Sequence, residues 1–264
     1  MAISSGHNVS VTGSDSSGHG GSSPSELTPD RQLARWGGVA GLAGVVLMLG
    51  AVAVVVAFGL PDASDTESLT DFADIESGRI AENTLYLGAL MLFALHALVL
   101  HRLLRTAHPA AALFGTAMAV FGLVTMAAGS LLHVATSPLA ELYDNPDTPP
   151  EDLPMIEYAW QGAQSVFDTL LATGVLLVPI GIVLLGIAMR ESPAFGLRLT
   201  RLTFGLGTVG IVGAMIAIVD PGSAFSAASV LAMVVFFLST GWHMLELGND
   251  VSIDLTDKEP TPAH

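Results

Sequence analysis

A stripe of polar side chains in an otherwise apolar segment is the first place where this chain could do chemistry. Glu157, Gln161, Gln164 and Asp168 are spaced at i, i+4, i+7 and i+11, which places them on one face of a helix. Such a stripe predicts a polar face that points inward or along a partner. The apolar segment that continues to Met189 is already long enough for a bilayer from about residue 169, so Asp168 is expected at the outer boundary of the membrane.

Other polar side chains are expected at the same depth, and together they predict an outward-facing pocket. The candidate pocket residues are Asn83, Tyr86, Ser130, His133, Gln161, Gln164 and Asp168. In such a pocket a carboxylate and an imidazole would each favour the charged form of the other, and the pocket would bind a small polar solute or a cation. The alternative is that these are ordinary interfacial residues that hydrogen-bond to water and loop backbone.

Two histidines lie deeper in the apolar part of the chain. His96 interrupts the run ALMLFALHALVLHRLL, and His243 lies near the inner end of the last apolar segment. Two histidines on separate helices can ligate haem axially, or a metal ion with further ligands. Here no spacing signature and no carboxylate at that depth accompany them, which favours a neutral imidazole bonded to a neighbouring helix. No cofactor is predicted, and the metal content stays unknown.

Motifs for catalysis are missing from the sequence. The chain has no phosphate-binding glycine loop, no HExxH zinc motif and no nucleophile elbow. With Cys 0 it has no disulfide, thiolate metal site or cysteine nucleophile. We therefore predict no catalytic residues, and the sequence does not favour an enzyme.

The elements that must position these side chains are apolar helices. The composition is 51% hydrophobic and 12% charged, against about a quarter charged in a soluble domain. About 20 apolar residues cross a bilayer as a helix, and the predicted helices are about 37–60, 83–104, 111–133, 157–189, 202–220 and 224–246. The predicted fold is an all-α, polytopic bundle of six transmembrane helices over 31–248. A Ser/Gly-rich disordered tail over 1–30 and an acidic disordered tail over 249–264 flank it.

The distribution of charge predicts the orientation of this bundle. With a cytoplasmic N-terminus, Arg79 is the one basic residue outside, and eight lie on the cytoplasmic side: Arg31, Arg35, Arg102, Arg105, Arg190, Arg198, Arg201 and Lys258. The chain is thus predicted to be a multi-pass protein of the cell membrane with both termini in the cytoplasm. Trp160 is expected at the outer headgroup level. The net charge of -15 argues against a nucleic-acid partner, and the acidic loops are interpreted as an adaptation to high salt rather than as a cation-collecting vestibule.

Glycine and proline in the predicted helices indicate close packing. Small residues let helix backbones approach in lipid, and they recur in two of the helices, as Gly37, Gly38, Gly41 and Gly44 and as Gly205, Gly207, Gly210 and Gly213. Pro179 removes one backbone hydrogen bond inside the predicted helix 157–189 and predicts a kink. We expect this kink to serve packing rather than a hinge.

The second half of the chain, with LLVPIGIVLLGIAMRESPAFGLRLTRLTFGLGTVGIVG, resembles a six-helix family of bacterial and archaeal membrane proteins, domain of unknown function 4386. The shared features are a helix that ends in a basic residue, a short cytoplasmic link and a Gly-rich fifth helix, here Arg190, Ser192, Pro193, Phe195 and Gly196 with the helix that follows. The N-terminal tail and the long acidic loops depart from this pattern. The resemblance implies the architecture and no activity, and the acid balance resembles that of haloarchaeal proteins.

Three classes of function remain open from the sequence. The first is a non-enzymatic bundle that binds a small ligand or lipid, or serves as an accessory subunit. The second is a secondary transporter or cation-conducting protein that uses Asp168 and His133, although the inner halves of several helices lack polar groups for a path. The third is a haem protein or membrane enzyme that uses His96 and His243. The expected partners are membrane lipids, a small polar ligand or cation, and a second copy or another membrane subunit.

Overall fold

The computed structural model describes residues 24–60, 68–219 and 226–249 of the chain. In these residues the secondary structure is entirely helical, in the order α1 Pro24–Phe58, α2 Ser68–Leu104, α3 Pro109–Ala135, α4 Ser137–Asp144, α5 Leu153–Glu191, α6 Leu197–Val219 and α7 Ser226–Asn249. Six spans are long and apolar enough to cross a membrane, and the short helix α4 continues the third of them beyond α3. The predicted all-α bundle of six membrane-spanning helices is confirmed.

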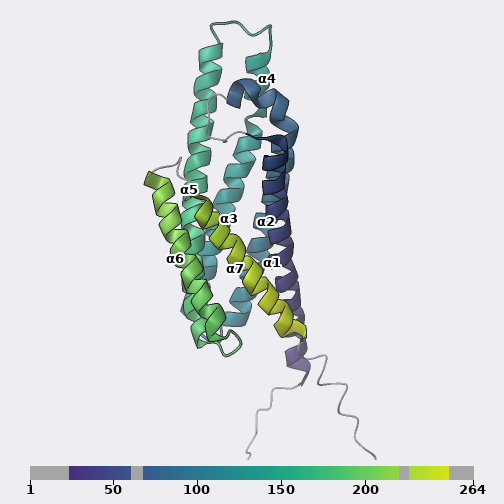
Figure 1. The fold of residues 1–264 in the computed structure, drawn as a ribbon, viewed down its shortest axis with the longest axis vertical. Coiled ribbons are helices and arrows are strands. Elements are labelled where there is room, and N and C mark those ends of the chain that lie inside the picture. Colours follow the sequence, from purple (N-terminus) through teal and green to yellow (C-terminus); the bar gives the residue numbers. More distant parts are fainter. Residues whose placement is uncertain (1–23, 61–67, 220–225, 250–264) are drawn as a thin grey trace, which may run out of the picture.

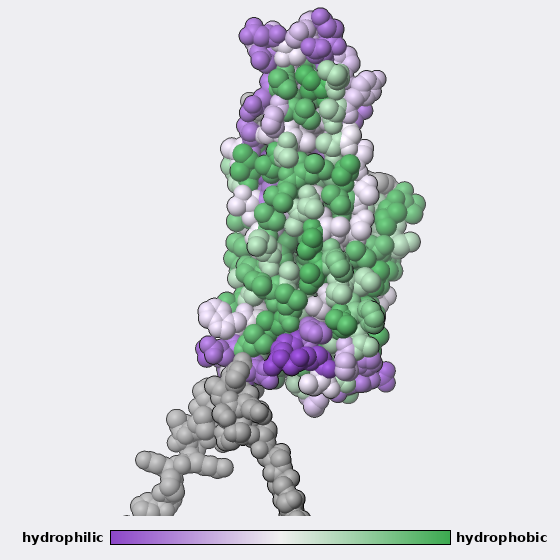
Figure 2. Space-filling model, turned by 180° about the vertical axis from the view of Figure 1, so that it is seen from behind, coloured by the Kyte–Doolittle hydropathy of each residue, from purple (hydrophilic) through white to green (hydrophobic). Residues whose placement is uncertain are grey.

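The helices lie side by side along one long axis (Figure 1). At one end, which we call the acidic end, α4 and the first parts of α2 and α5 reach beyond the other helices. At the opposite end, which we call the arginine-rich end, lie Arg31, Arg35, Arg102, Arg105, Arg190, Arg198 and Arg201. Figure 2 shows a broad apolar band between hydrophilic ends, which is the surface that a bilayer requires. The chain is therefore a multi-pass membrane protein.

Several helices are longer than their apolar runs predict. α1 already begins at Pro24, inside the predicted tail, α2 begins at Ser68 rather than near residue 83, and α4 was not predicted. An apolar run predicts only the part of a helix that lies in lipid. The helix can continue into water where the residues beyond the run also favour a helix. For α2 the polar extension carries acidic residues near its N-terminus, which complement the helix dipole. The rest of both predicted tails lies outside the described residues.

Two clusters of buried apolar side chains hold the bundle together. The main core runs through the centre of the bundle, where the rings of Phe93 in α2 and Phe237 in α7 stack with centroids 4.0 Å apart. A small second core lies at the acidic end and joins Leu69, Ala140 and Trp160. Trp160 is only 1% exposed, so its ring is buried beneath α4 rather than exposed at the surface of the bundle. We call α4 and the first turns of α2 and α5 the cap.

The backbones of α3 and α5 are in close contact. Gly115 and Gly122 in α3 are seven residues apart, as are Gly174 and Gly181 in α5. A Cβ atom on Gly181 would lie 2.6 Å from the Gly115 carbonyl oxygen, and one on Gly174 would lie 2.6 Å from the Gly122 carbonyl oxygen. A seven-residue repeat keeps one face of a helix toward its partner, so these glycines form a continuous seam of backbone contact.

The glycines that the sequence analysis did single out divide into two groups. In α1 all four are buried, and added Cβ atoms would overlap α2 or α7 within 2.8 Å. In α6, Gly207 and Gly210 contact Pro179 and its neighbours in α5, whereas Gly205 is exposed and has nothing within 4 Å of an added Cβ atom. Close packing is confirmed for α1 and for the α6 face toward α5.

We predict that Gly181→Ala lowers the free energy of unfolding by about 1–3 kcal/mol, because the added methyl group must push two backbones apart. Gly205→Ala is the matched control. It adds the same methyl group to open space and should leave stability unchanged or raise it by up to about 1 kcal/mol, because alanine favours helix. Thermal unfolding in detergent, followed by circular dichroism, measures both variants. Equal stability of the two variants would contradict the close backbone contact between α3 and α5 at Gly181.

Candidate functional site

A hydrogen-bonded network near the acidic end joins two of the predicted pocket residues. The Ser130 hydroxyl of α3 donates to Asn83 Oδ1 of α2 at 2.6 Å, and Asn83 Nδ2 donates to the carbonyl oxygen of Arg79 at 2.9 Å. The Asn83 amide thus links two helices through its side chain while holding its own helix backbone. In lipid such interhelical hydrogen bonds favour association.

Arg79 is a buried member of this network that the sequence analysis treated only as a topological exception. Its side chain is 6% exposed, and its guanidinium lies 2.9 Å from the Glu82 carboxylate. Burial of an arginine is tolerated when an acidic partner compensates its charge. One turn earlier on α2, the Glu76 carboxylate accepts a hydrogen bond from the Ser137 hydroxyl of α4, which joins α4 to α2. The sequence does contain a signal for this ion pair: Arg79 is the one basic residue among the acidic residues of the predicted outer side, and Glu82 follows it by three residues.

The polar stripe of α5 has a buried side and an exposed side. Gln164 follows Trp160 by one helical turn and is buried beside it, and its Nε2 atom has no hydrogen-bond partner among the described residues. Gln161 and Asp168 are exposed, so they lie on the surface side of the helix. α5 turns its Trp160 edge toward the second core, which is why the two sides of the stripe differ in exposure. The pocket around Asp168 stays a prediction.

The last two predicted pocket residues lie on α2 and α3. Tyr86 is half-buried and packs against the main core. His133 belongs to α3, but its side chain lies outside the described residues. The proximity of His133 and Asp168 therefore stays a prediction.

His96 forms a junction of three helices. Its ring is fully buried, with Nδ1 2.8 Å from the Gly37 carbonyl oxygen of α1 and Nε2 3.0 Å from the Thr240 hydroxyl of α7. A carbonyl oxygen can only accept, so Nδ1 carries hydrogen. Nε2 faces the Thr240 hydroxyl, whose oxygen also lies 2.7 Å from the Phe236 carbonyl oxygen of its own helix. A Cβ atom on Gly41 would lie 2.6 Å from Nδ1, so glycine at this position makes room for the ring.

This junction bears on the haem hypothesis. Both ring nitrogens of His96 already have protein partners, and neither is open to an axial bond in this arrangement. His243 uses Nε2 to donate to the Ala194 carbonyl oxygen at 2.8 Å. Within the described part of the chain no group of three His, Cys, Asp or Glu residues is placed to hold a metal ion. The geometry agrees with structural hydrogen bonds for both histidines.

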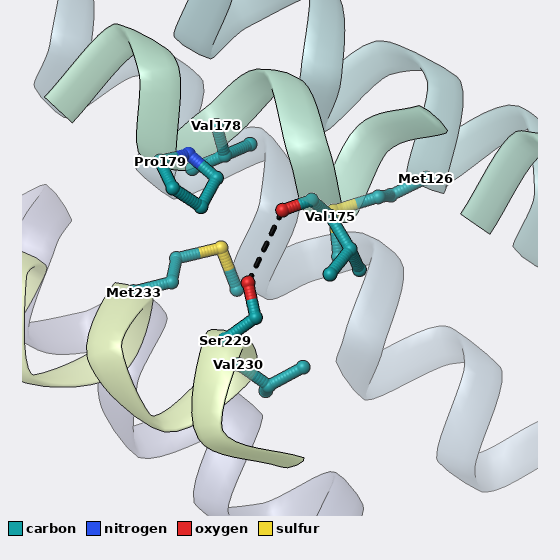
Figure 3. Close-up of a pocket in the computed structure, with 7 residues that line it drawn as sticks. All are labelled: Met126, Val175, Val178, Pro179, Ser229, Val230 and Met233. Atoms are coloured by element: carbon teal, nitrogen blue, oxygen red, sulfur yellow. Dashed lines mark hydrogen bonds between the residues drawn. The ribbon is translucent and has the colours of Figure 1, made fainter. Parts of the chain in front are cut away.

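Pro179 creates a second polar contact within the membrane part. Proline lacks an N–H group, so the Val175 carbonyl four residues earlier has no donor in its own helix. The Ser229 hydroxyl of α7 donates to this carbonyl at 3.1 Å (Figure 3). The hollow beside it is lined by Met126, Val178, Val230 and Met233 and is too narrow for a water molecule. This tight fit supports the interpretation that Pro179 serves helix packing rather than a hinge.

A larger cleft of about 170 Å³ opens at the arginine-rich end. It lies between the start of α1, the ends of α2 and α7, and the connection from α5 to α6. Its walls are Asp30, Arg31, Ala34, Leu103, Ala194, Phe195 and Leu247. None of the predicted pocket residues lines this cleft or the hollow at Pro179.

We predict that Ser229→Ala lowers the free energy of unfolding by about 1 kcal/mol, because the Val175 carbonyl loses its donor. In a Pro179→Ala background residue 179 supplies its own N–H group, and the same serine substitution should have less than half this effect. Ser165→Ala, which removes a hydroxyl bonded only within α5, is the control and should have no measurable effect. Unfolding of the single and double variants in detergent gives the coupling energy. An equal loss in both backgrounds would contradict this role of Ser229.

Comparisons with known proteins add no family to this geometry. No family model, no curated protein and no solved structure matches the chain. The resemblance to the six-helix family therefore stays a prediction.

Proposed function

We propose that the protein is a non-enzymatic membrane bundle that binds membrane lipid and serves as an accessory subunit of the cell membrane. One observation carries the proposal: three buried polar groups of the described helices are engaged in contacts between helices. His96 joins three helices, Ser229 bonds to the α5 backbone, and Asn83 bonds to Ser130. Groups used in this way hold a scaffold together, whereas catalysis needs polar groups that face a substrate.

The centre of the bundle favours binding at the surface over passage through the interior. The stacked rings of Phe93 and Phe237 lie there with Phe236 against them, and Ile182 and Met189 are fully buried in the same core. A transporter needs a polar path and helices broken at the binding site. The dry hollow beside Pro179 supports a closed interior.

Lipid is the ligand that the surface of the bundle favours. Large apolar side chains such as Val46, Phe114, Phe121 and Leu231 are more than half exposed on three different helices, and in a bilayer they contact acyl chains. The arginines gathered at one end support a cytoplasmic location for that end, and hence for the start of α1 and the end of α7. An accessory role is supported by the structural use of the buried polar groups His96, Ser229 and Ser130.

We predict that the protein purified in mild detergent retains phospholipid, visible in native mass spectrometry as discrete adducts that survive removal of the micelle. In the same preparation no Soret band should appear. Proteoliposomes should show the cation flux of protein-free vesicles, because apolar side chains fill the core of the described helices. A protein-dependent flux that Asp168→Asn abolishes would overturn the proposal in favour of transport. A Soret band that His96→Gln removes would overturn it in favour of haem binding.

A further inference from the structure

The cleft at the arginine-rich end is built from parts that differ in polarity. Ala34, Leu103, Phe195 and Leu247 give it apolar walls, and Asp30 and Arg31 lie at its polar side. Four segments far apart in the sequence contribute, so the cleft is a product of the folded bundle. At about 30 Å³ for each water molecule, its volume of about 170 Å³ is room for five or six waters, or for a group the size of a phosphate ester.

The charges around the cleft leave a positive excess. The Asp30 carboxylate lies 3.5 Å from Arg102, which compensates its charge. Arg31 has no ion pair within the described part of the chain and is half-buried at the cleft. The Arg35 side chain packs against Gly248, next to the Leu247 wall. On α7 near this wall, His243 Nδ1 lies 3.7 Å from the Glu246 carboxylate.

The depth of the cleft matches the headgroup region of a leaflet. Trp36 and Trp242 are 66% and 60% exposed, and exposed tryptophans mark the membrane–water boundary. Arg31 precedes Trp36 by five residues on α1, and Leu247 follows Trp242 by five residues on α7. The cleft therefore lies about 7 Å beyond the tryptophan level, at 1.5 Å per helical residue.

We infer that this cleft holds the headgroup of an anionic phospholipid from the leaflet at the arginine-rich end. The inference rests on the proposed lipid-binding function and adds the site and the lipid class. Arg31, with Arg35 and Arg102 near it, binds the phosphate, and the apolar walls contact the glycerol and the first part of the acyl chains. Free phosphate would gain nothing from these walls, so the occupant is a lipid. Basic pockets between membrane helices suit such headgroups.

The test titrates dioleoyl phosphatidylglycerol into the delipidated full-length protein in detergent and counts bound lipid by native mass spectrometry. Dioleoyl phosphatidylcholine is the neutral comparison. We expect the wild type to prefer the anionic lipid about fivefold or more. Arg31→Gln should weaken its binding about fivefold, the loss expected for one basic residue at a membrane surface. Millimolar inorganic phosphate should not displace the lipid.

Arg201→Gln is the matched control, because it removes the same charge at the same end from α6. Within the described helices α6 contacts neither α1 nor α2, so binding should change less than twofold. Ala194→Phe fills the cleft from an exposed position without a change of charge, and it should weaken binding as much as Arg31→Gln. It keeps the test decisive if Arg31→Gln fails to fold.

The outcomes separate the site from the proposed function. Equal weakening by Arg31→Gln and Arg201→Gln, or no effect of Ala194→Phe, would overturn the site while lipid binding stands. Displacement by inorganic phosphate would overturn the lipid as occupant. Failure of the wild type to retain either lipid would overturn the proposed function itself.

Discussion

The structure depends on one constraint, which is that apolar burial gives helices in lipid no net drive to associate. The α3–α5 seam answers this constraint with backbone contact. Gly115 and Gly122 meet Gly181 and Gly174 so closely that a single methyl group would overlap main-chain atoms. Dispersion forces act over the whole length of such a contact. The other helices pack around this pair. α6 contacts the Pro179 region of α5, and α7 contacts α1 on one side and α6 on the other.

The same solvent explains where the polar side chains lie. A backbone or side-chain polar group in lipid must find its partner inside the protein, and the bundle meets this demand between helices. Ser229 supplies the donor that Pro179 cannot, and His96 joins α1 to α7 through Gly37 and Thr240. These contacts hold the interior closed, so the surfaces left for binding are the lipid-facing band and the two ends. Arg31, which has no ion pair among the described residues, makes the arginine-rich end the more favourable of the two for an anionic ligand.

The fold could be predicted from the sequence because each membrane span is a local property of about 20 apolar residues. The polar part was less accessible. Gln164 is buried and Asp168 is exposed because α5 turns Trp160 beneath α4, and α4 itself has too short an apolar segment to be predicted. The contact between His96 and Thr240 spans 144 positions along the chain, and no local pattern reveals it. The seven-residue spacing of Gly174 and Gly181 is present in the sequence, but two glycines so far apart are a weaker packing signal than the dense glycines of α1 and α6.

The central claim is that α3 and α5 meet backbone to backbone. A crystal structure of the full-length protein grown from a lipid phase tests it through one distance, from the Ala119 nitrogen to the Gly181 Cα atom. The contact of an added Cβ atom on Gly181 with that nitrogen implies a distance of no more than about 4 Å. Helix axes about 8–10 Å apart, with side chains between the two backbones as in ordinary helix packing, would contradict the account.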